Sequence, residues 1–131
     1  MIPKFKAWVK PGVLSNHPDG VVADAKPDFL GMTCLVKRDD LKGNKCFTEI
    51  IDFEDIELMQ STGLKDKNDV EIFEGDIVAI KYTEHGYQYY EKIVFENGTF
   101  TAGDEDWLYN VKEYCVVCGN IYEDKELLEV E

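Results

Sequence analysis

The sequence predicts an all-β protein in which seven or eight short antiparallel strands form a small barrel or packed sheets, followed by a short C-terminal helical turn. Three observations support this fold class. The 7 Tyr and 7 Phe, together with many Val and Ile residues, tilt the composition towards strands. Turn signals recur at a spacing of about 8–12 residues, which is typical of barrels and sandwiches. No segment of about 12 residues carries the apolar stripe of a helix.

The first third of the chain is expected to supply three or four of these strands. Residues 4–9 alternate between apolar and polar side chains, as a half-buried strand does. Residues 11–27 are rich in Gly, Pro, Asp and Asn, which predicts turns around at most one short strand at residues 21–23. Residues 29–36 and 45–53 are predicted to form a hairpin, because a polar loop separates these two apolar segments.

Residues 59–80 are the segment around which the rest of the predicted fold is arranged. A short apolar strand meets a polar turn at residues 65–69, and a second apolar strand leaves from a bend at Gly75 and Asp76. Glycine at the bend can adopt a positive φ without a side-chain clash, and the Asp76 carboxylate can accept hydrogen bonds from nearby backbone N–H groups. The segment therefore indicates a structural role rather than a chemical one.

The clearest hairpin signal is the dipeptide Asn97-Gly98. It separates two strand-like segments, and both residues tolerate the positive φ that a two-residue type I′ turn requires. Such a turn sets Phe95 opposite Phe100, and Ile93 opposite Ala102, on one face of the hairpin.

The C-terminal segments carry weaker signals. Residues 104–109 are expected to form a loop or one helical turn, and residues 111–122 a strand that Gly119 interrupts. Residues 123–128 are expected to form a helical turn with Asp124 as its N-cap.

Length bounds the organisation of the chain. At 131 residues it is long enough to bury one core, so residues 1–131 are expected to form a single domain. No apolar run approaches the roughly 20 residues that cross a bilayer. No apolar signal segment precedes the first charged residues, so a soluble intracellular protein without membrane association is expected.

The net charge of −13 is unevenly distributed. Residues 1–48 hold 8 basic and 5 acidic residues, whereas residues 49–131 hold 6 basic and 22 acidic residues. An acidic field repels phosphate backbones, so direct binding to DNA or RNA is not expected. Such a charge is typical either of a surface that keeps a protein soluble or of one that attracts a basic partner.

Four cysteines offer one metal-site hypothesis. Cys115-Val-Val-Cys118 followed by Gly resembles a zinc knuckle, and Cys34 and Cys46 could complete four thiolates. However, the two intervening valines favour extended backbone, and residues three apart on a strand point to opposite faces. Buried free thiols are therefore expected, with a zinc site through the four cysteines as the alternative.

Other chemical signals are weak. The acidic clusters at residues 52–55 and 104–106 could hold Mg²⁺, although solvated acidic surfaces are expected there. His17 and His85 lie in turn-rich segments and are expected to be solvated. The sequence contains no Gly-rich phosphate loop, no HExxH and no G-x-S-x-G. A non-enzyme without catalytic residues, cofactor or metal is therefore expected.

Three blocks of the sequence resemble the YopX family of phage and prophage proteins. The blocks are Lys4–Trp8, then Met59–Asn68 continuing through Glu71–Val78, and finally Gly119–Glu123 with Glu126–Leu128. Residues 10–48 match no part of the pattern and form the most divergent part of the domain, while residues 57–131 form its core. Three positions depart from the family pattern, which usually has Gly at Asp69, Pro at Lys125 and an aliphatic residue at Cys118.

The resemblance implies a β-rich fold, a phage or prophage origin and a place in the bacterial host cytoplasm. The family has no established biochemical function, so no catalytic residue carries over. The positions expected to fix turns and bulges are Gly63, Gly75, Asp76, Asn97, Gly98 and Gly119.

The expected function is that of a non-enzymatic accessory protein that binds protein, either a second copy of itself or a host or phage component. Exposed edge strands and a mixed acidic and aromatic surface would suit this role. That surface is expected at Asp104, Glu105, Asp106, Trp107 and Tyr109. The alternatives are an acidic decoy that inhibits a host nucleic-acid-binding enzyme and a zinc-binding protein.

Overall fold

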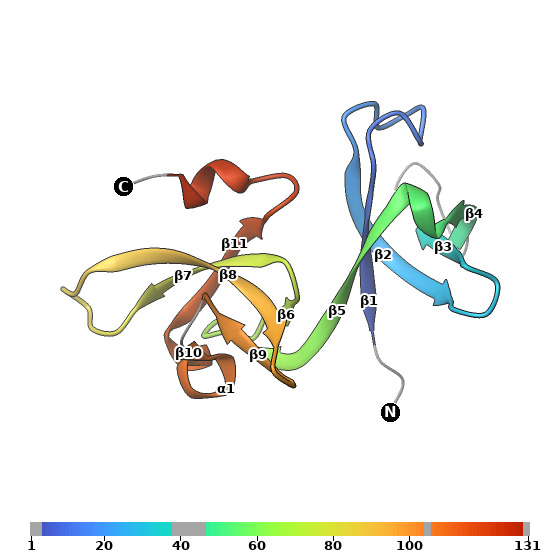
Figure 1. Ribbon diagram of the computed structural model, residues 1–131. Helices are drawn as coiled ribbons and strands as arrows, with labels where there is room; N and C mark the ends of the chain where they lie inside the picture. The colour runs from blue at the N-terminus through green and yellow to red at the C-terminus, as the bar shows by residue number, and fades with distance from the viewer. Residues whose placement is uncertain (1–3, 38–46, 104–105, 130–131) are drawn as a thin grey trace. The chain divides into compact units, whose positions relative to one another are not determined.

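The structure is a computed structural model that describes residues 4–37, 47–103 and 106–129 (Figure 1). Packing divides the chain into two compact units, Met1–Gln60 and Ser61–Glu131. Each unit has its own hydrophobic cluster. Whether the whole chain unfolds as the single predicted domain stays a prediction.

Unit 1 is an antiparallel sheet with the strand order β4-β3-β2-β1-β5, to which β5 contributes its first half. Its elements are β1 (Phe5–Val9), β2 (Val21–Asp28), β3 (Thr33–Lys37), β4 (Phe47–Asp52), the 3₁₀ turn η1 (Phe53–Asp55) and β5 (Ile56–Lys65). The predicted strand at residues 4–9 is confirmed. The predicted hairpin is confirmed as the β3–β4 pair, but its first strand begins at Thr33 instead of residue 29, because residues 29–32 form a turn. Alternate side chains of the strands face one core, as Ala7 and Val9 of β1 do with Cys34 and Val36 of β3.

The prediction for residues 21–23 was wrong in extent, because β2 continues to Asp28. Composition suggested turns here, yet β2 pairs with β1 on one side and with β3 on the other. Ladder hydrogen bonds on both sides stabilise a strand that its own sequence only weakly favours.

Unit 2 contains a five-stranded antiparallel sheet with the order β10-β9-β8-β7-β11, and the second half of β5 pairs with β6. Its strands after β5 are β6 (Glu71–Phe73), β7 (Asp76–Lys81), β8 (Gln88–Glu96), β9 (Thr99–Ala102), β10 (Asp106–Trp107) and β11 (Cys115–Asn120). Its helical elements are α1 (Leu108–Val111) and the 3₁₀ turns η2 (Lys112–Tyr114) and η3 (Lys125–Leu128). Figure 1 shows α1 beside β9 and β10.

The all-β class with a C-terminal helical turn is therefore confirmed. Within the described residues neither strand order returns to its first strand, so the sheets are open rather than closed into a barrel. The described residues form eleven strands instead of seven or eight, because bends and very short strands such as β10 divide the chain more finely than the turn signals do. None of the described helices is long and apolar enough to cross a membrane.

β7 pairs with β8 and β11 and supplies much of the core of unit 2. Its side chains Val78 and Ile80 are fully buried and pack in one cluster with Ile93 and Leu108. The predicted pairing of the β8–β9 hairpin is confirmed, because Phe95 lies opposite Phe100. Asn97 and Gly98 between these strands have φ values of 53° and 81°.

The bend at Gly75 joins three segments of unit 2. Gly75 has a φ of 91°, a conformation that glycine adopts readily and other residues do not. Its N–H donates to the Ile93 carbonyl oxygen at 2.8 Å, and its own carbonyl oxygen accepts from the Ile121 N–H at 2.9 Å. The neighbouring Asp76 carboxylate accepts from the Phe73 N–H at 2.8 Å.

The C-terminal turn differs from its prediction in one detail. Asp124 precedes η3, but its side chain makes no cap hydrogen bond. Its carboxylate instead accepts from the Asn120 N–H at 3.2 Å. The reason is steric, because a Cβ at Gly119 would lie only 2.5 Å from that carboxylate, and glycine gives Asp124 room to turn back towards β11.

Gly75→Val is expected to destabilise the protein more than the control Gly98→Val. Both substitutions force an L-residue to a positive φ, at a cost of about 1–2 kcal/mol. The turn at Gly98 is exposed, with open space where its Cβ would lie, whereas Gly75 is buried and hydrogen-bonded to two other segments. Calorimetry should give the lower melting temperature for Gly75→Val, and equal values would contradict this role for the bend.

Candidate functional site

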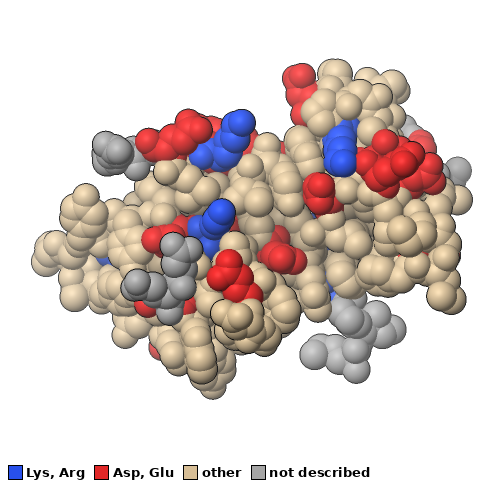
Figure 2. All heavy atoms as spheres, in the orientation of Figure 1, with Lys and Arg blue, Asp and Glu red and all other residues tan. Residues whose placement is uncertain are grey.

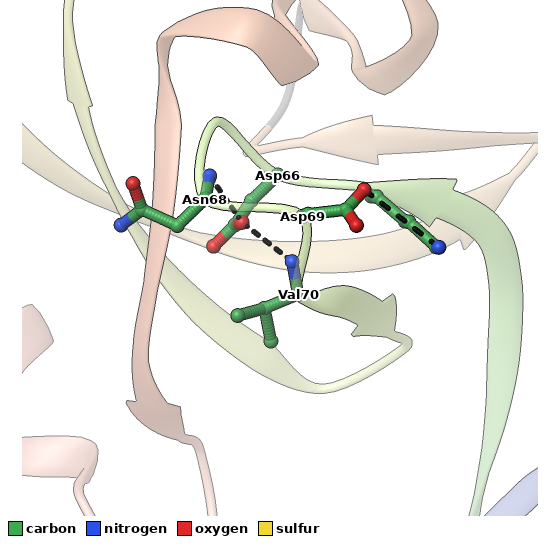
Figure 3. Close-up of polar contacts among 5 residues, drawn as sticks. Asp66, Asn68, Asp69 and Val70 are labelled. Carbon is green, nitrogen blue, oxygen red and sulfur yellow. Dashed lines mark hydrogen bonds and ion pairs between the residues drawn. The ribbon is translucent and has the colours of Figure 1, made fainter.

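The buried Asp66 side chain holds a turn against a strand (Figure 3). One carboxylate oxygen, Oδ1, accepts from the Asn68 N–H at 2.8 Å and from the Val70 N–H at 2.9 Å. The other, Oδ2, accepts from the Val117 N–H of β11 at 2.8 Å. The adjacent Lys67 N–H donates to the Cys115 carbonyl oxygen at 2.9 Å. The turn therefore satisfies backbone groups on the edge of β11 that does not pair with β7.

Asn120 likewise satisfies backbone N–H groups, at the other end of β11. Its Oδ1 accepts from the N–H groups of Tyr122 and Glu123 at 3.0 and 2.8 Å. Its Nδ2 donates to the Glu123 carboxylate at 3.0 Å. Asp66, Asp76 and Asn120 are thus buried polar groups that satisfy the backbone, and their chemistry is structural.

The turn-and-bulge positions named from the sequence lie in four places. Gly63 has a φ of 76° within β5, Gly75 lies in the bend before β7, and Asp76 is the first residue of β7. Asn97 and Gly98 connect β8 to β9. Gly119 has no positive φ; it lies where the register of β11 against β7 shifts.

The cysteines differ in their burial and lie in different units. Cys34 is buried in unit 1, whereas Cys115 is buried and Cys118 exposed on β11 of unit 2. Cys46 lies outside the described residues. Burial raises the pKa of the Cys115 thiol to about 12 and also raises the pKa of Cys34. Partial desolvation by the neighbouring residues raises the pKa of Cys118, although its side chain is exposed. A high pKa disfavours the thiolate that binds zinc.

The expectation that all four thiols are buried was wrong for Cys118. Residues 115 and 118 take opposite faces of the strand, and the core face is occupied by Cys115. The Cys118 thiol donates to the Val116 carbonyl oxygen at 3.2 Å. Among the described residues, no observation favours the zinc alternative.

One acidic cluster has ligand atoms close together. Carboxylate oxygens of Asp52, Glu54 and Asp55, at the end of β4 and in η1, all lie within 4.8 Å of one another. Asp52 and Glu54 are exposed and Asp55 is half-buried, as in a solvated acidic surface. Of the second predicted cluster, Asp104 and Glu105 lie outside the described residues.

The interaction surface expected from the sequence is partly described. Asp106 and Trp107 form β10, an edge strand paired only with β9 in the described chain. Trp107 is 60% exposed and Tyr109, at the start of α1, is 70% exposed. The Lys112 ammonium lies 5.7 Å from the centre of the Tyr109 ring, within the range of a cation–π contact.

A hollow on the sheet of unit 2, which we call the tyrosine groove, was not predicted. It has a volume of about 830 Å³. Its floor is Ala79, which pairs with Tyr90 of β8 on one side and with Val116 of β11 on the other. Because Val78 and Ile80 face the core, Ala79 faces away from it. A small side chain between two larger ones in the same row leaves the hollow.

Two further tyrosines wall the groove. The Tyr82 and Tyr114 rings lie 4.9 Å apart, centre to centre. The Tyr89 hydroxyl lies 3.2 Å from that of Tyr82, and burial, followed by this hydrogen bond, raises the pKa of Tyr89, so it stays neutral. The Gln88 amide donates to the Tyr90 hydroxyl at 3.3 Å, which fixes a third ring. The walls are therefore ordered by contacts within the protein.

The charged lining of the groove is balanced. Lys67 and Lys81 line it together with Glu84 and Glu113. A sequence signal was present, because all 7 tyrosines lie between residues 82 and 122 and Ala79 is the small residue within an apolar strand. The sequence did not reveal that residues of three strands align in one row, and this alignment brings the residues of the groove together.

The fold and its buried polar groups define a mainly-β protein with open antiparallel sheets and exposed aromatic surfaces. The chain belongs to the YopX family, whose sequence model, described as "YopX protein", matches residues 32–129. The match begins at residue 32, inside the segment 10–48 that holds none of the three resembling blocks, and it does not include the Lys4–Trp8 block.

A solved structure agrees with this assignment. The crystal structure of protein EF1440 from Enterococcus faecalis superposes with a TM-score of 0.63 at 27% sequence identity, covering 98% of this chain and 99% of that chain. None of the curated proteins matches the chain.

The departure from the family pattern at Asp69 has a structural explanation. Asp69 has a φ of 68°, a conformation that favours glycine, the residue that the resemblance implies at this position. Asp is one of the residues that tolerate it. The exposed Asp69 carboxylate also lies 3.7 Å from the Lys65 ammonium.

Asp66→Ala is expected to lower the free energy of unfolding by about 2–4 kcal/mol, because three N–H groups lose their acceptor. The matched control is Asp69→Gly in the same turn, which removes an exposed carboxylate and relieves a positive φ. Urea unfolding should place Asp66→Ala far below the wild type and Asp69→Gly at or slightly above it. Equal stabilities of the two variants would remove Asp66 from this role.

The thiols are expected to differ in reactivity. Of Cys34, Cys115 and Cys118, only Cys118 is exposed. In the native protein at pH 8, a thiol reagent such as DTNB should therefore react with Cys118. Cys118→Ser should abolish that reaction, whereas Cys34→Ser and Cys115→Ser should preserve it. The raised pKa of Cys118 should make that reaction slower than that of free cysteine. If Cys115→Ser instead removes a fast phase of the thiol reaction, then Cys115 is accessible to the reagent in the native protein, which would show that β11 opens.

Metal analysis addresses the zinc alternative with the same variants. Protein purified without chelator is expected to hold far less than one zinc per chain, and EDTA should leave its melting temperature unchanged. Stoichiometric zinc that is lost in Cys115→Ser would establish the metal site instead.

Proposed function

We propose that this protein is a non-enzymatic module that binds another protein by taking a polypeptide segment into the tyrosine groove. The observation that carries the proposal is the groove itself, with Tyr82, Tyr90 and Tyr114 around the small floor residue Ala79. Its volume falls within the range of about 300–1,000 Å³ that is common for ligand sites.

Tyrosine suits this task physically. Its ring supplies a large contact area with few rotatable bonds, and its hydroxyl satisfies polar groups of a ligand, so little conformational entropy is lost on binding. Tyr82 and Tyr114 already pack on each other, so their positions need little change when a ligand enters. Aromatic residues are enriched at protein interfaces for these reasons.

The charges favour a polypeptide over a nucleic acid. The groove lining holds two lysines and two glutamates, which is not the basic stripe that tracks a phosphate backbone. The net charge of −13 adds a repulsive field. A segment with mixed polar and apolar side chains fits the lining best.

The wider setting belongs to the same proposal. The resemblance to phage and prophage proteins supports action in the cytoplasm of a bacterial host, on a host or phage protein. The exposed β10 surface with Trp107 and Tyr109 is a further place for protein contact. The acidic decoy gains no support, because the face in Figure 2 shows acidic side chains in separate groups with basic ones among them.

The test is comparative capture from bacterial cells by the tagged full-length chain. Ala79→Leu fills the floor of the groove and Tyr114→Ala removes a wall, whereas Tyr87→Ala truncates an 84% exposed tyrosine outside the lining. Both groove variants are expected to weaken capture of the partner at least about tenfold, as for loss of an interface anchor, while Tyr87→Ala leaves it unchanged. Melting temperatures should stay close to that of the wild type.

Equal capture by all four proteins would reject the groove as the binding site. If no protein is recovered above background by the wild type, the binding function itself is rejected.

A further inference from the structure

The turn between β2 and β3 in unit 1 exposes three large apolar side chains. Phe29 is 58% exposed, Leu30 is 100% exposed and Met32 is 59% exposed, within four consecutive residues. Single exposed apolar residues are ordinary on protein surfaces, but a group of them at one tip marks an interaction site. We call Phe29, Leu30 and Met32 the apolar tip.

The apolar tip is held in one conformation. The Asp28 carboxylate accepts from the N–H groups of Leu30 and Gly31 at 3.1 and 3.0 Å. The Phe29 ring packs edge-on against the rings of Phe5 and Phe53, with centres 5.8 and 5.6 Å apart. A tip fixed in advance loses little conformational entropy when it docks.

Met32 shows that the shape of the tip is maintained against local preference. It has a φ of 56°, which residues with a Cβ rarely adopt. Its carbonyl oxygen accepts from the Phe53 N–H at 3.0 Å, so the conformation is fixed by a neighbouring element. Backbone strain of this kind is concentrated at functional positions.

Acidic groups border the tip. Asp52 pairs with Thr33, the residue after Met32, and Phe53, which contacts both Phe29 and Met32, lies between Asp52 and Glu54. We call Asp52, Glu54 and Asp55, whose carboxylates lie together, the acidic rim. The neighbouring Lys10 ammonium donates to the Glu54 carbonyl oxygen at 2.8 Å and lies 4.0 Å from the Glu57 carboxylate. Four carboxylates, those of the acidic rim and that of Glu57, stand against the one Lys10 ammonium, so this border is negative.

We propose that the apolar tip and acidic rim form a second docking site, which inserts into an apolar pocket bordered by Lys or Arg on a partner protein. The charge argues for this occupant, because carboxylates beside the tip are repelled by anionic lipid headgroups and attracted by basic side chains. In the complex, the Leu30 side chain becomes buried in the partner's pocket and acts as the anchor. The carboxylates of the acidic rim orient the two proteins and attract the partner over a longer distance. The site lies in unit 1 and does not depend on the tyrosine groove of unit 2.

The first experiment identifies the occupant directly. A photo-crosslinking residue, p-benzoylphenylalanine, replaces Leu30 in the full-length chain expressed in bacterial cells, with the same residue at Tyr87 as the exposed control in unit 2. The proposal expects a protein crosslinked from position 30 alone, at a pocket of apolar residues with Lys or Arg beside it. Crosslinks only to a second copy of this chain, only to lipid, or to nothing would overturn it.

The second experiment measures affinity of the identified partner for three variants. Leu30→Asp is expected to weaken binding at least tenfold without a change in melting temperature, because the side chain it replaces is fully exposed. The triple variant Asp52→Asn, Glu54→Gln, Asp55→Asn should weaken binding and reduce its dependence on salt. Tyr87→Asp should have no effect. Unchanged affinity and unchanged salt dependence in the triple variant would overturn the role of the rim.

A vesicle control separates protein from membrane. Vesicles rich in phosphatidylglycerol are expected not to bind the protein, and binding that Leu30→Asp abolishes would replace the partner protein by a lipid surface and overturn the proposal. Failure of the groove variants in the capture experiment leaves these outcomes unaffected, since none of them alters unit 1.

Discussion

The arrangement of unit 2 depends on the hydrogen bonds that the Asp66 carboxylate accepts. This carboxylate binds N–H groups within its own turn and one in β11, 51 residues further along the chain. Buried N–H groups without an acceptor are costly, so the carboxylate fixes both the turn and the outer edge of β11. Two neighbours of this contact, Val116 beside Val117 and Lys67 beside Asp66, line the tyrosine groove. The stability of unit 2 and the candidate site therefore both involve the segments that Asp66 joins.

The residues through which the chain resembles its family are, in this light, determinants of fold. Gly75 supplies a positive φ, Asp76 accepts from the chain that precedes it, and Asn120 caps the segment that follows β11. None of these polar groups is free for chemistry. Family membership therefore specifies an architecture, and function has to be sought in the side chains that the architecture displays.

The two units display different chemistry. The tyrosine groove of unit 2 is concave, aromatic and balanced in charge, whereas the apolar tip of unit 1 is convex, aliphatic in its most exposed residue and bordered by carboxylates. In each case hydrogen bonds or ring contacts fix the presenting residues beforehand. Surfaces with such different chemistry suit different partner surfaces, because complementary charge and shape both contribute to specificity.

The sequence by itself determined what rests on local chemistry. Asn97-Gly98 dictated a hairpin and its register, and alternation dictated β1. The C-terminal helical turn was located correctly, although the Asp124 side chain does not cap it as the sequence suggested. Tertiary structure decided the rest. β2 extends because two neighbours pair with it, and the register shift between Val117 and Gly119 sets how the end of β11 meets β7. The tyrosine groove needs Tyr90, Ala79 and Val116 in one row. Such rows join residues far apart in sequence, and their alignment follows from burial and pairing of the whole sheet, which no local pattern encodes.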